Sequence, residues 1–427
     1  MLRSILAIML SVVIAGSHSL SHAIPAYAFV EVDALPEQPL IPDPFLKPDG
    51  TRVRSRAEWP AQRAYLRAKM EHYLYGTIPP NPSAKEMRYE RLSDEAFSPT
   101  GSSIKGRKQT YRITIQRVGL SYSYRFTLYR PEPLKPYPTL INNKPEYGYP
   151  NPTFSKDEGV RRGYAVVEFN RDEVAPDDPN NADRKAGVFA LYPEYDFHTI
   201  GAWAWAYQPV INVLQQEGAT DMAKIIGAGH SRGGATAMAA AIFDERIAFV
   251  APSATGPFST SVMRQRDPAG FRGRDDYAEI MVKQFPHWYH PRFRAFAGRG
   301  LRMPWDAPTL AALVAPRPLL SLSSLGDGYD NYLALESGIR ADTMIYDWFG
   351  AGRWVRVHWR DFENSFGQKG HNLGPEEFLA IYDMADEYFF GKSPGKSNFN
   401  RGPGRQGWMT DPIKNPLKLN WSTPPTQ

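Results

Sequence analysis

Ile225-Ile-Gly-Ala-Gly-His-Ser-Arg-Gly-Gly-Ala-Thr-Ala-Met-Ala-Ala-Ala241 is the stretch that decides how this chain is interpreted. A short apolar run precedes the pentad Gly229-His-Ser-Arg-Gly233, and an alanine-rich run typical of a helix follows it. On a sharp strand-to-helix turn, the serine projects its hydroxyl above the sheet, and small glycines prevent side-chain clashes at the corner. The first amides of the helix point to the same place and can stabilise an oxyanion. The stretch predicts a serine hydrolase with Ser231 as nucleophile, and the alternative is a Gly/Ser turn without chemistry.

The composition is that of a globular protein with a substantial core. The 427 residues suffice for one large domain or two smaller ones, and 42% of them are hydrophobic. The net charge of +5 is small for this length and no block of like charge stands out, which argues against nucleic acid as a partner. The absence of cysteine excludes disulfides, thiolate metal sites and a cysteine-linked lipid anchor.

The N-terminus has the pattern of an export signal at residues 1–23. Met1-Leu-Arg3 is followed by the apolar run Ile5–Ala15 and by small residues up to Ala23. Cleavage is expected after Ala23, with Ala28 as a competing site and an uncleaved anchor as the alternative. The apolar run is too short to span a membrane, and no later segment is long and apolar enough. We therefore expect a periplasmic or secreted protein without membrane attachment after cleavage.

The rest of the chain divides by composition into three parts. We expect an extended, proline-rich N-terminal arm at 24–64, a catalytic domain at 65–390 and a Gly/Pro-rich tail at 391–427. Apolar residues at helical spacing predict a helix over 59–76, which ends at Gly76 and the following prolines.

The order of the elements predicts an α/β fold. Alternation of polar and apolar residues over 109–129 is typical of antiparallel strands. Short apolar strands alternating with helices then imply a mostly parallel sheet covered on both faces. The expected strands are 138–141, 165–169, 224–226, 247–250 and 318–323, and the expected helices are 200–216 and 375–390.

A nucleophilic serine needs a base, and the base needs an acid that orients it. Of the nine histidines, His371 lies in a loop just before the last expected helix, where the final histidine of such a triad belongs. Asp327 follows the expected strand at 318–323 and is favoured as the acid. Asp330 is a close competitor, because one turn residue decides which carboxylate points inward.

Other histidines fit structural roles better. His230 is beside the nucleophile and is expected to point away from it, and His358 lies in a segment that alternates like a strand. His287 and His290 have a loose metal-ligand spacing, but no carboxylate motif accompanies them and an aromatic loop is the better interpretation. We expect no metal and no cofactor.

The turn around Ser231 is called the elbow below. Residues 65–390, which include it, resemble the glucuronoyl methylesterases of carbohydrate esterase family 15, especially the bacterial members. The resemblance is carried by the elbow, by the loop of His371 and by the stretches Tyr73–Pro80, Gly163–Val167, Gly201–Trp205, Phe243–Ala248 and Ala312–Pro318. It implies an α/β-hydrolase fold, a three-layer sandwich with a mostly parallel central sheet. It also implies cleavage of the ester between glucuronate side groups of xylan and lignin alcohols.

Carried over by position, Ser231 resembles the family's nucleophile and His371 its base. Arg232 resembles the arginine that stabilises the oxyanion, a role that suits a fixed cation. The alternative for Arg232 is an ion pair with a nearby carboxylate. Arg264 and Trp288 are secondary candidates for substrate contact, because an arginine and an aromatic ring suit the hydroxyls and the apolar face of a sugar.

The chain departs from the family pattern at three places. Ala235 occupies the position of a lysine that often contacts the sugar, and Tyr329 that of a tryptophan that lines the substrate site in some members. The segment Pro252–Gly256, where many members have their acid, contains no carboxylate. Other members place the acid after the later strand, which supports Asp327.

The sequence thus predicts an exported esterase with a Ser-His-Asp triad whose substrate is a glucuronoxylan or another uronate-bearing polysaccharide ester. One alternative is an acetyl or other short-acyl carbohydrate esterase, favoured by Ala235, because one fold hosts many ester chemistries. Another is a non-catalytic carbohydrate-binding homologue. The oligomeric state does not follow from the sequence.

Overall fold

The computed structural model describes residues 27–143, 153–265, 277–329, 331–361, 363–367, 369–393, 395–400 and 416–425. The expected export signal, the competing acid Asp330 and residues 401–415 of the expected tail lie outside the described residues. None of the described helices combines the length and the apolar character needed to cross a membrane.

The strands of the described residues form one nine-stranded sheet in the order β1-β2-β3-β5-β4-β6-β7-β8-β9. Strands β1 to β3 and the β3–β5 pair are antiparallel, whereas β4 to β9 are parallel. The predicted, mostly parallel sheet is confirmed. The strands are β1 (Met87–Phe97), β2 (Gly106–Arg117), β3 (Leu120–Pro131), β4 (Tyr137–Asn143), β5 (Ala165–Phe169), β6 (Thr220–His230), β7 (Ile247–Ser253), β8 (Leu319–Ser324) and β9 (Val355–Arg360).

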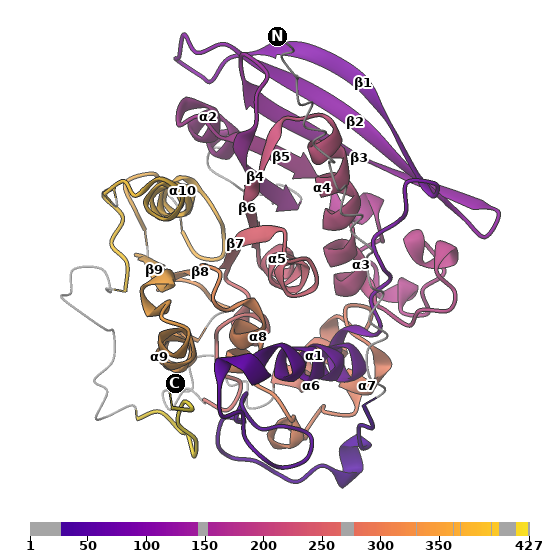
Figure 1. Ribbon diagram of the computed structural model, residues 1–427, viewed down its shortest axis with the longest axis vertical. Coiled ribbons are helices and arrows are strands. Elements are labelled where there is room, and N and C mark those ends of the chain that lie inside the picture. The colour runs from indigo at the N-terminus through magenta and orange to yellow at the C-terminus, as the bar shows by residue number, and fades with distance from the viewer. Residues whose placement is uncertain are drawn as a thin grey trace, which may run out of the picture.

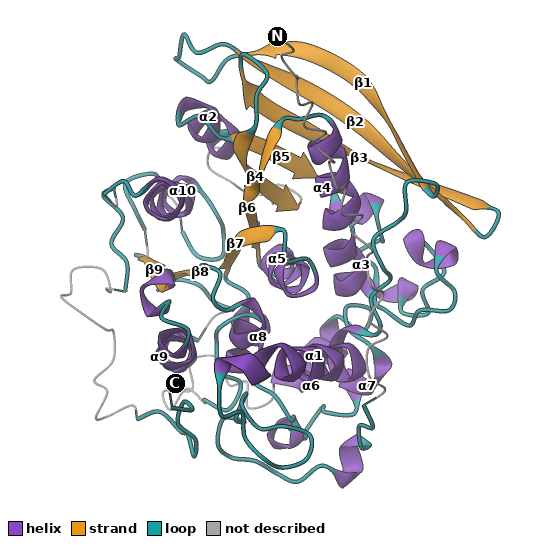
Figure 2. Ribbon diagram, in the orientation of Figure 1, coloured by secondary structure: helices purple, strands orange, loops and turns teal. Residues whose placement is uncertain are grey.

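Helices cover both faces of this sheet (Figure 1). Successive strand residues point to opposite faces, so Val167 joins the large core and Val166 the smaller core with α2 and α10. Figure 2 shows the helices on either side of the strands. They are α1 (Trp59–Met70), α2 (Phe154–Arg161), α3 (Thr199–Trp205), α4 (Tyr207–Gln216), α5 (Arg232–Phe243), α6 (Tyr277–Gln284), α7 (Pro291–Arg294), α8 (Ala307–Val314), α9 (Tyr332–Trp348) and α10 (Pro375–Phe390).

The helix expected over 200–216 is interrupted in the structure. It divides at Ala206 into α3 and α4, and Pro209 contributes to the interruption because it lacks the N–H that a continuous helix would use.

The N-terminal arm packs onto the end of the chain. Phe45 is fully buried, and its ring contacts Trp348 of α9 and Trp421 near the C-terminus. The indole of Trp421 donates a hydrogen bond of 2.9 Å to the carbonyl of Ile41. These contacts join residues about 380 positions apart, so the described tail residues 416–425 pack against the arm. Helix α1 begins at Trp59, inside the range expected for the arm.

Candidate active site

The turn between β6 and α5 holds Ser231 in a backbone conformation that non-glycine residues seldom adopt. Its φ is +54°, and its amide donates a 2.7 Å hydrogen bond to the carbonyl of Ser253 at the end of β7. A Cβ on Gly229 would lie 2.3 Å from the carbonyl oxygen of Gly233, and one on Gly234 would lie 2.5 Å from Thr255 Cγ2. The glycines thus allow the close approach that the turn requires, and the serine lies at the carboxyl end of a central strand.

The structure brings His371 and Asp327 together, as predicted from the sequence. His371 Nδ1 lies 2.8 Å from Asp327 Oδ2 and 3.0 Å from Oδ1. Asp327 is buried just beyond β8, and its Oδ1 also accepts a 2.7 Å hydrogen bond from the amide of Tyr329. Because the carboxylate accepts the Nδ1 proton, it selects the tautomer whose Nε2 is free to take a proton from a serine.

A buried ion pair supports the loop that carries His371. Arg360 ends β9, and its Nε binds the carboxylate of Glu377 in α10, with both side chains almost completely buried. Its Nη2 donates to the carbonyl of Gly370, next to the histidine, at 2.6 Å. Glu377 in turn accepts a 3.0 Å hydrogen bond from the amide of Gly374. The pair therefore ties both ends of the histidine loop to the sheet and to α10.

His230 packs against His371 and was not expected there. The two ring centroids are 4.3 Å apart with an interplanar angle of 49°, and His230 Nδ1 lies 3.1 Å from Ser253 Oγ. Burial first, and then the positive charges around it, lower the pKa of His230 well below its usual value. A neutral imidazole thus forms one wall against the ring of His371.

Arg232 is held in an ion pair, which was the alternative considered from the sequence. Its Nη1 lies 2.6 Å from Asp177 Oδ2, and its guanidinium carbon lies 4.7 Å from the centre of the Trp288 ring. Trp288 is only 5% exposed and donates its indole N–H to Asp177 Oδ1 at 2.9 Å. Its ring therefore packs on Arg232, which corrects the expectation that Trp288 contacts the substrate. Nothing in the local sequence indicated Asp177.

The other two expected substrate contacts have different outcomes. The ring of Tyr329 is 54% exposed and its centroid lies 4.8 Å from that of His371, so it borders the site. Arg264 is buried instead, paired with Asp306 at 2.9 Å and hydrogen-bonded to the carbonyls of Trp305 and Gln38. The assignment of Arg264 to the substrate is therefore wrong, because its guanidinium is used within the core.

Comparison with known proteins identifies the family. Residues 113–350 match the family described as glucuronyl esterase, fungi. The chain belongs to this family. Among curated proteins it is 25% identical over 288 residues to a 4-O-methyl-glucuronoyl methylesterase of Podospora anserina, covering 66% of this chain and 55% of that protein. It is 29% identical over 324 residues to 4-O-methyl-glucuronoyl methylesterase 1 of Wolfiporia cocos, covering 73% and 72%. The chain thus spans about half the length of the first of these relatives.

Solved structures of the same group share the fold. A carbohydrate esterase family 15 glucuronoyl esterase of Caldicellulosiruptor kristjansonii superposes with a TM-score of 0.71 at 24% identity, covering 92% of this chain and 99% of that one. The glucuronoyl esterase catalytic domain of Hypocrea jecorina gives 0.70 at 21% identity, with 94% and 100% covered. The expected α/β-hydrolase sandwich is confirmed.

The departures from the family pattern are visible in the structure of this glucuronyl esterase family member. Ala235 is 3% exposed within α5, and Ala254, in the segment that lacks a carboxylate, has a φ of +48°. The side chain of Ala235 has no group that could donate to a sugar.

The two histidines with a loose metal-ligand spacing contact different carboxylates. His287 Nε2 lies 2.9 Å from Asp177, whereas His290 Nε2 lies 3.1 Å from Asp196. No group of three or more potential ligands with metal-binding geometry occurs within the described part of the chain.

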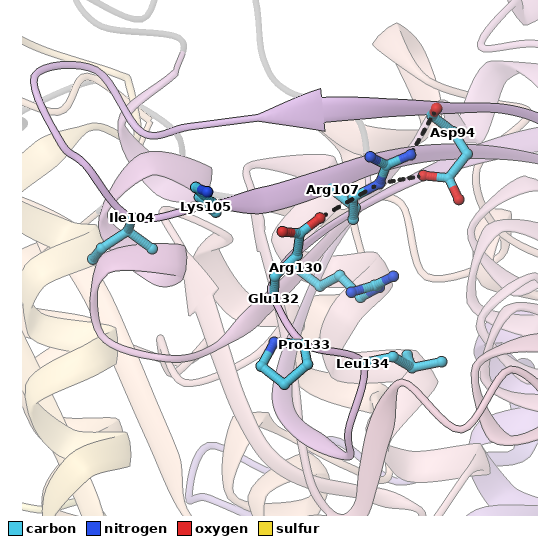
Figure 3. A pocket seen from close by; sticks show the side chains of 8 residues that line it. All are labelled: Asp94, Ile104, Lys105, Arg107, Arg130, Glu132, Pro133 and Leu134. Atoms are coloured by element: carbon cyan, nitrogen blue, oxygen red, sulfur yellow. Dashed lines mark hydrogen bonds and ion pairs between the residues drawn. The ribbon is translucent and has the colours of Figure 1, made fainter.

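A surface hollow of about 610 Å³ (Figure 3) has a lining that contains none of the residues expected to form the triad. Tyr129 of β3 pairs with Val166 near the start of β5, so the hollow beyond the end of β3 lies at the amino edge of the parallel strands. Arg107 pairs there with Asp94 and Glu132. The hollow is therefore separate from the catalytic edge. Its lining is Asp94, Ile104, Lys105, Arg107, Arg130, Glu132, Pro133 and Leu134.

Replacing Arg360 by methionine should lower the free energy of unfolding by about 3–5 kcal/mol, because it leaves the charge of the buried Glu377 carboxylate without its cation. Urea unfolding followed by tryptophan fluorescence measures this. The double variant Arg360→Met/Glu377→Gln removes the buried charge while retaining an acceptor for the Gly374 amide, and it should recover part of the loss. A single variant within about 1 kcal/mol of wild type would contradict the role given to the pair.

Asp327→Asn should lower kcat for ester hydrolysis by up to about 10⁴-fold, because an amide facing Nδ1 favours the wrong histidine tautomer. Asp330→Asn is the matched variant, and it should retain wild-type kcat. Steady-state kinetics on both proteins decide between the two aspartates. The reverse result would make Asp330 the acid.

The buried histidines should make stability depend on pH between about 6.5 and 5. Burial lowers the pKa of His198 to about 3 and that of His230 well below its usual value. The unfolded chain therefore binds protons below about pH 6.5 that the native protein does not, and the free energy of unfolding falls by up to about 1.4 kcal/mol per pH unit for each histidine.

Urea unfolding at pH 7, 6 and 5 measures this slope. His230→Asn should reduce the slope by the contribution of one histidine, which is up to about 1.4 kcal/mol per pH unit, and His198→Asn should reduce it by a similar amount. Groups that titrate in both proteins cancel in the comparison with wild type. An unchanged slope in both variants would contradict the neutral, buried state of these rings.

Proposed function

We propose that this protein is an exported serine carboxylesterase that hydrolyses 4-O-methyl-glucuronate esters in lignin–carbohydrate material. The observation that carries the proposal is the contact between His371 and Asp327, in a chain of the glucuronyl esterase family. The ring of His371 packs on His230, the residue before the strained Ser231. The names of the relatives from Podospora anserina and Wolfiporia cocos point to the same ester.

In the first half of the reaction, Ser231 Oγ attacks the uronate ester carbonyl and His371 Nε2 accepts its proton. Asp327 holds the imidazolium that results. The carbonyl oxygen becomes an oxyanion, to which the amide of Arg232 at the start of α5 and the Arg232 guanidinium donate. Collapse of this intermediate expels the alcohol, which takes the proton from His371, and leaves the glucuronoyl group esterified to Ser231.

In the second half, water replaces the alcohol. His371 takes a proton from the water as it attacks the acyl carbonyl, and the same donors stabilise the second oxyanion. Collapse returns the proton to Ser231 and releases free glucuronate. These steps need side chains and backbone amides of the chain and two substrates, the ester and water.

A short-acyl carbohydrate esterase is the second candidate. The burial of Ala235 within α5 favours it, because a sugar-binding lysine is missing at this position. The acyl-transfer chemistry of the triad would be unchanged, since it does not depend on that contact.

Export rests on the residue pattern at 1–23. We propose that the signal is removed and that residues 65–390 form the catalytic domain.

Hydrolysis of benzyl glucuronate, methyl glucuronate and an aryl acetate by the purified protein tests the proposed function. The uronate esters should be cleaved with the higher kcat/KM, and Ser231→Ala should lower kcat on the order of 10⁶-fold, to background. Ser121→Ala, on an exposed part of β3, is the matched control and should match wild type.

Cleavage of the acetate alone would support the short-acyl esterase. Turnover that survives in Ser231→Ala would contradict the serine mechanism. If no ester is cleaved, the proposal fails and a non-catalytic carbohydrate-binding protein becomes the better interpretation.

A further inference from the structure

We propose that Asp177 is a positioning residue that orients the guanidinium of Arg232 toward the oxyanion. The inference deepens the proposed function and rests on it. Asp177 lies in the loop after β5, 54 residues before the nucleophile, and its side chain is 12% exposed.

Three donors from two parts of the chain bind this carboxylate through both of its oxygens. Oδ2 accepts from Arg232 Nη1 at 2.6 Å, and Oδ1 accepts from His287 Nε2 and from the indole of Trp288, each at 2.9 Å. A carboxylate bound from both oxygens cannot rotate without breaking at least one bond. The Asp177 side chain is therefore a fixed point against which Arg232 is held.

Aromatic rings hold the guanidinium from a second direction. Phe285 stacks on Trp288 with a centroid distance of 3.9 Å and an interplanar angle of 7°. The guanidinium carbon of Arg232 lies 4.7 Å from the centre of Trp288 and 5.1 Å from that of Phe285. The cation is thus held by two rings and by the carboxylate, which removes most of the rotamer freedom of a long side chain.

Asp177 also stays ionised over the working range of an esterase. Burial acts to raise its pKa, but the hydrogen bond from His287, the charge of Arg232 and the bond from Trp288 outweigh it and hold the pKa well below the usual value. A carboxylate near an oxyanion would repel the oxyanion if no hydrogen-bond donor bound the carboxylate. Here three donors share the charge of Asp177, so the carboxylate can orient Arg232 at little electrostatic cost.

Arg232 still has capacity to bind the reacting group. Nη1 is used by Asp177, while the side chain as a whole is 31% exposed. Among the described residues, Asp177 is the only carboxylate that pairs with it. One edge of the guanidinium is tied to the protein, and its other N–H groups are left to donate elsewhere.

Asp177→Asn tests the proposal, because it retains the size of the side chain and loses the charge that orients Arg232. We expect kcat for the uronate ester to fall about 10- to 100-fold, less than the loss of a whole oxyanion donor, with KM within about threefold of wild type. Asp178→Asn is the matched control, since Asp178 is exposed and accepts hydrogen bonds from the backbone and side chain of Asn180 in the adjacent short turn. It should retain wild-type kcat.

A double-variant cycle separates positioning from general damage. In an Arg232→Ala background, Asp177→Asn should cause less than about a twofold further loss in kcat, because the carboxylate then has no guanidinium to orient. The thermal midpoints of Asp177→Asn and wild type should agree within a few degrees. Equal kcat in Asp177→Asn and Asp178→Asn would overturn the proposal, as would a loss that adds in full to that of Arg232→Ala.

A substrate-independent probe distinguishes this inference from the proposed function. Ser231 Oγ attacks the phosphorus of an aryl alkylphosphonate monoester, His371 accepts the serine proton, and the aryloxide leaves. The product is a tetrahedral, anionic phosphonate ester of the serine, and its formation does not require uronate recognition. If no uronate ester is cleaved, the phosphonylation rate of Ser231 replaces kcat, and the same 10- to 100-fold loss in Asp177→Asn supports the positioning role. A wild-type protein that reacts with neither probe would overturn both proposals.

Discussion

The strained turn at Ser231 is the constraint on which the site depends. A φ of +54° costs a serine about 1–3 kcal/mol of backbone strain, and favourable contacts around the turn have to offset this free energy. The 2.7 Å hydrogen bond from its amide to the carbonyl of Ser253 contributes by joining the turn to β7, and Gly229 allows the close approach to Gly233 that the turn requires. Because β6 to β9 are parallel and adjacent, the same edge of the sheet also supplies Asp327 and the loop of His371.

Two aspartate–histidine pairs lie on this edge, and they differ in exposure. His371 bonds to Asp327 at 2.8 Å and its side chain is 24% exposed, so it can exchange protons with a substrate or with water. His287 bonds to Asp177 at 2.9 Å but is only 1% exposed, which suits a fixed donor and excludes it as a general base. In the proposed mechanism the same pair of residue types therefore serves proton transfer where the histidine is exposed and positioning where it is buried.

Local patterns were enough to predict the elbow and the parallel strands, because both depend on a short apolar strand followed by a turn. They placed His371 before the last helix and an acid after β8, but they left Asp327 and Asp330 as competitors for that role. The pattern failed where tertiary packing decides. Trp203 and Trp205 lie two residues apart on α3, a spacing that puts them on different helix faces, yet both are fully buried because every residue of α3 is buried. Arg360 and Asp177 could not be found from sequence, since their partners lie 17 and 55 residues away and no motif marks such pairs.

The departures at the sugar-facing positions leave the acyl chemistry intact. In the proposed mechanism the triad and Arg232 act on the ester carbonyl, whereas the positions of Ala235 and Tyr329 resemble those through which family members contact the sugar ring. A missing lysine removes a charge-assisted hydrogen bond, so it weakens discrimination between sugars more than it slows acyl transfer. Tyr329 keeps an aromatic face with a polar tip, exposed and within 4.8 Å of the His371 ring. In the proposed site, the catalytic residues are therefore combined with a less polar surface for the sugar. An ester whose sugar ring stacks on the Tyr329 ring suits this site better than one whose sugar ring must bind a lysine.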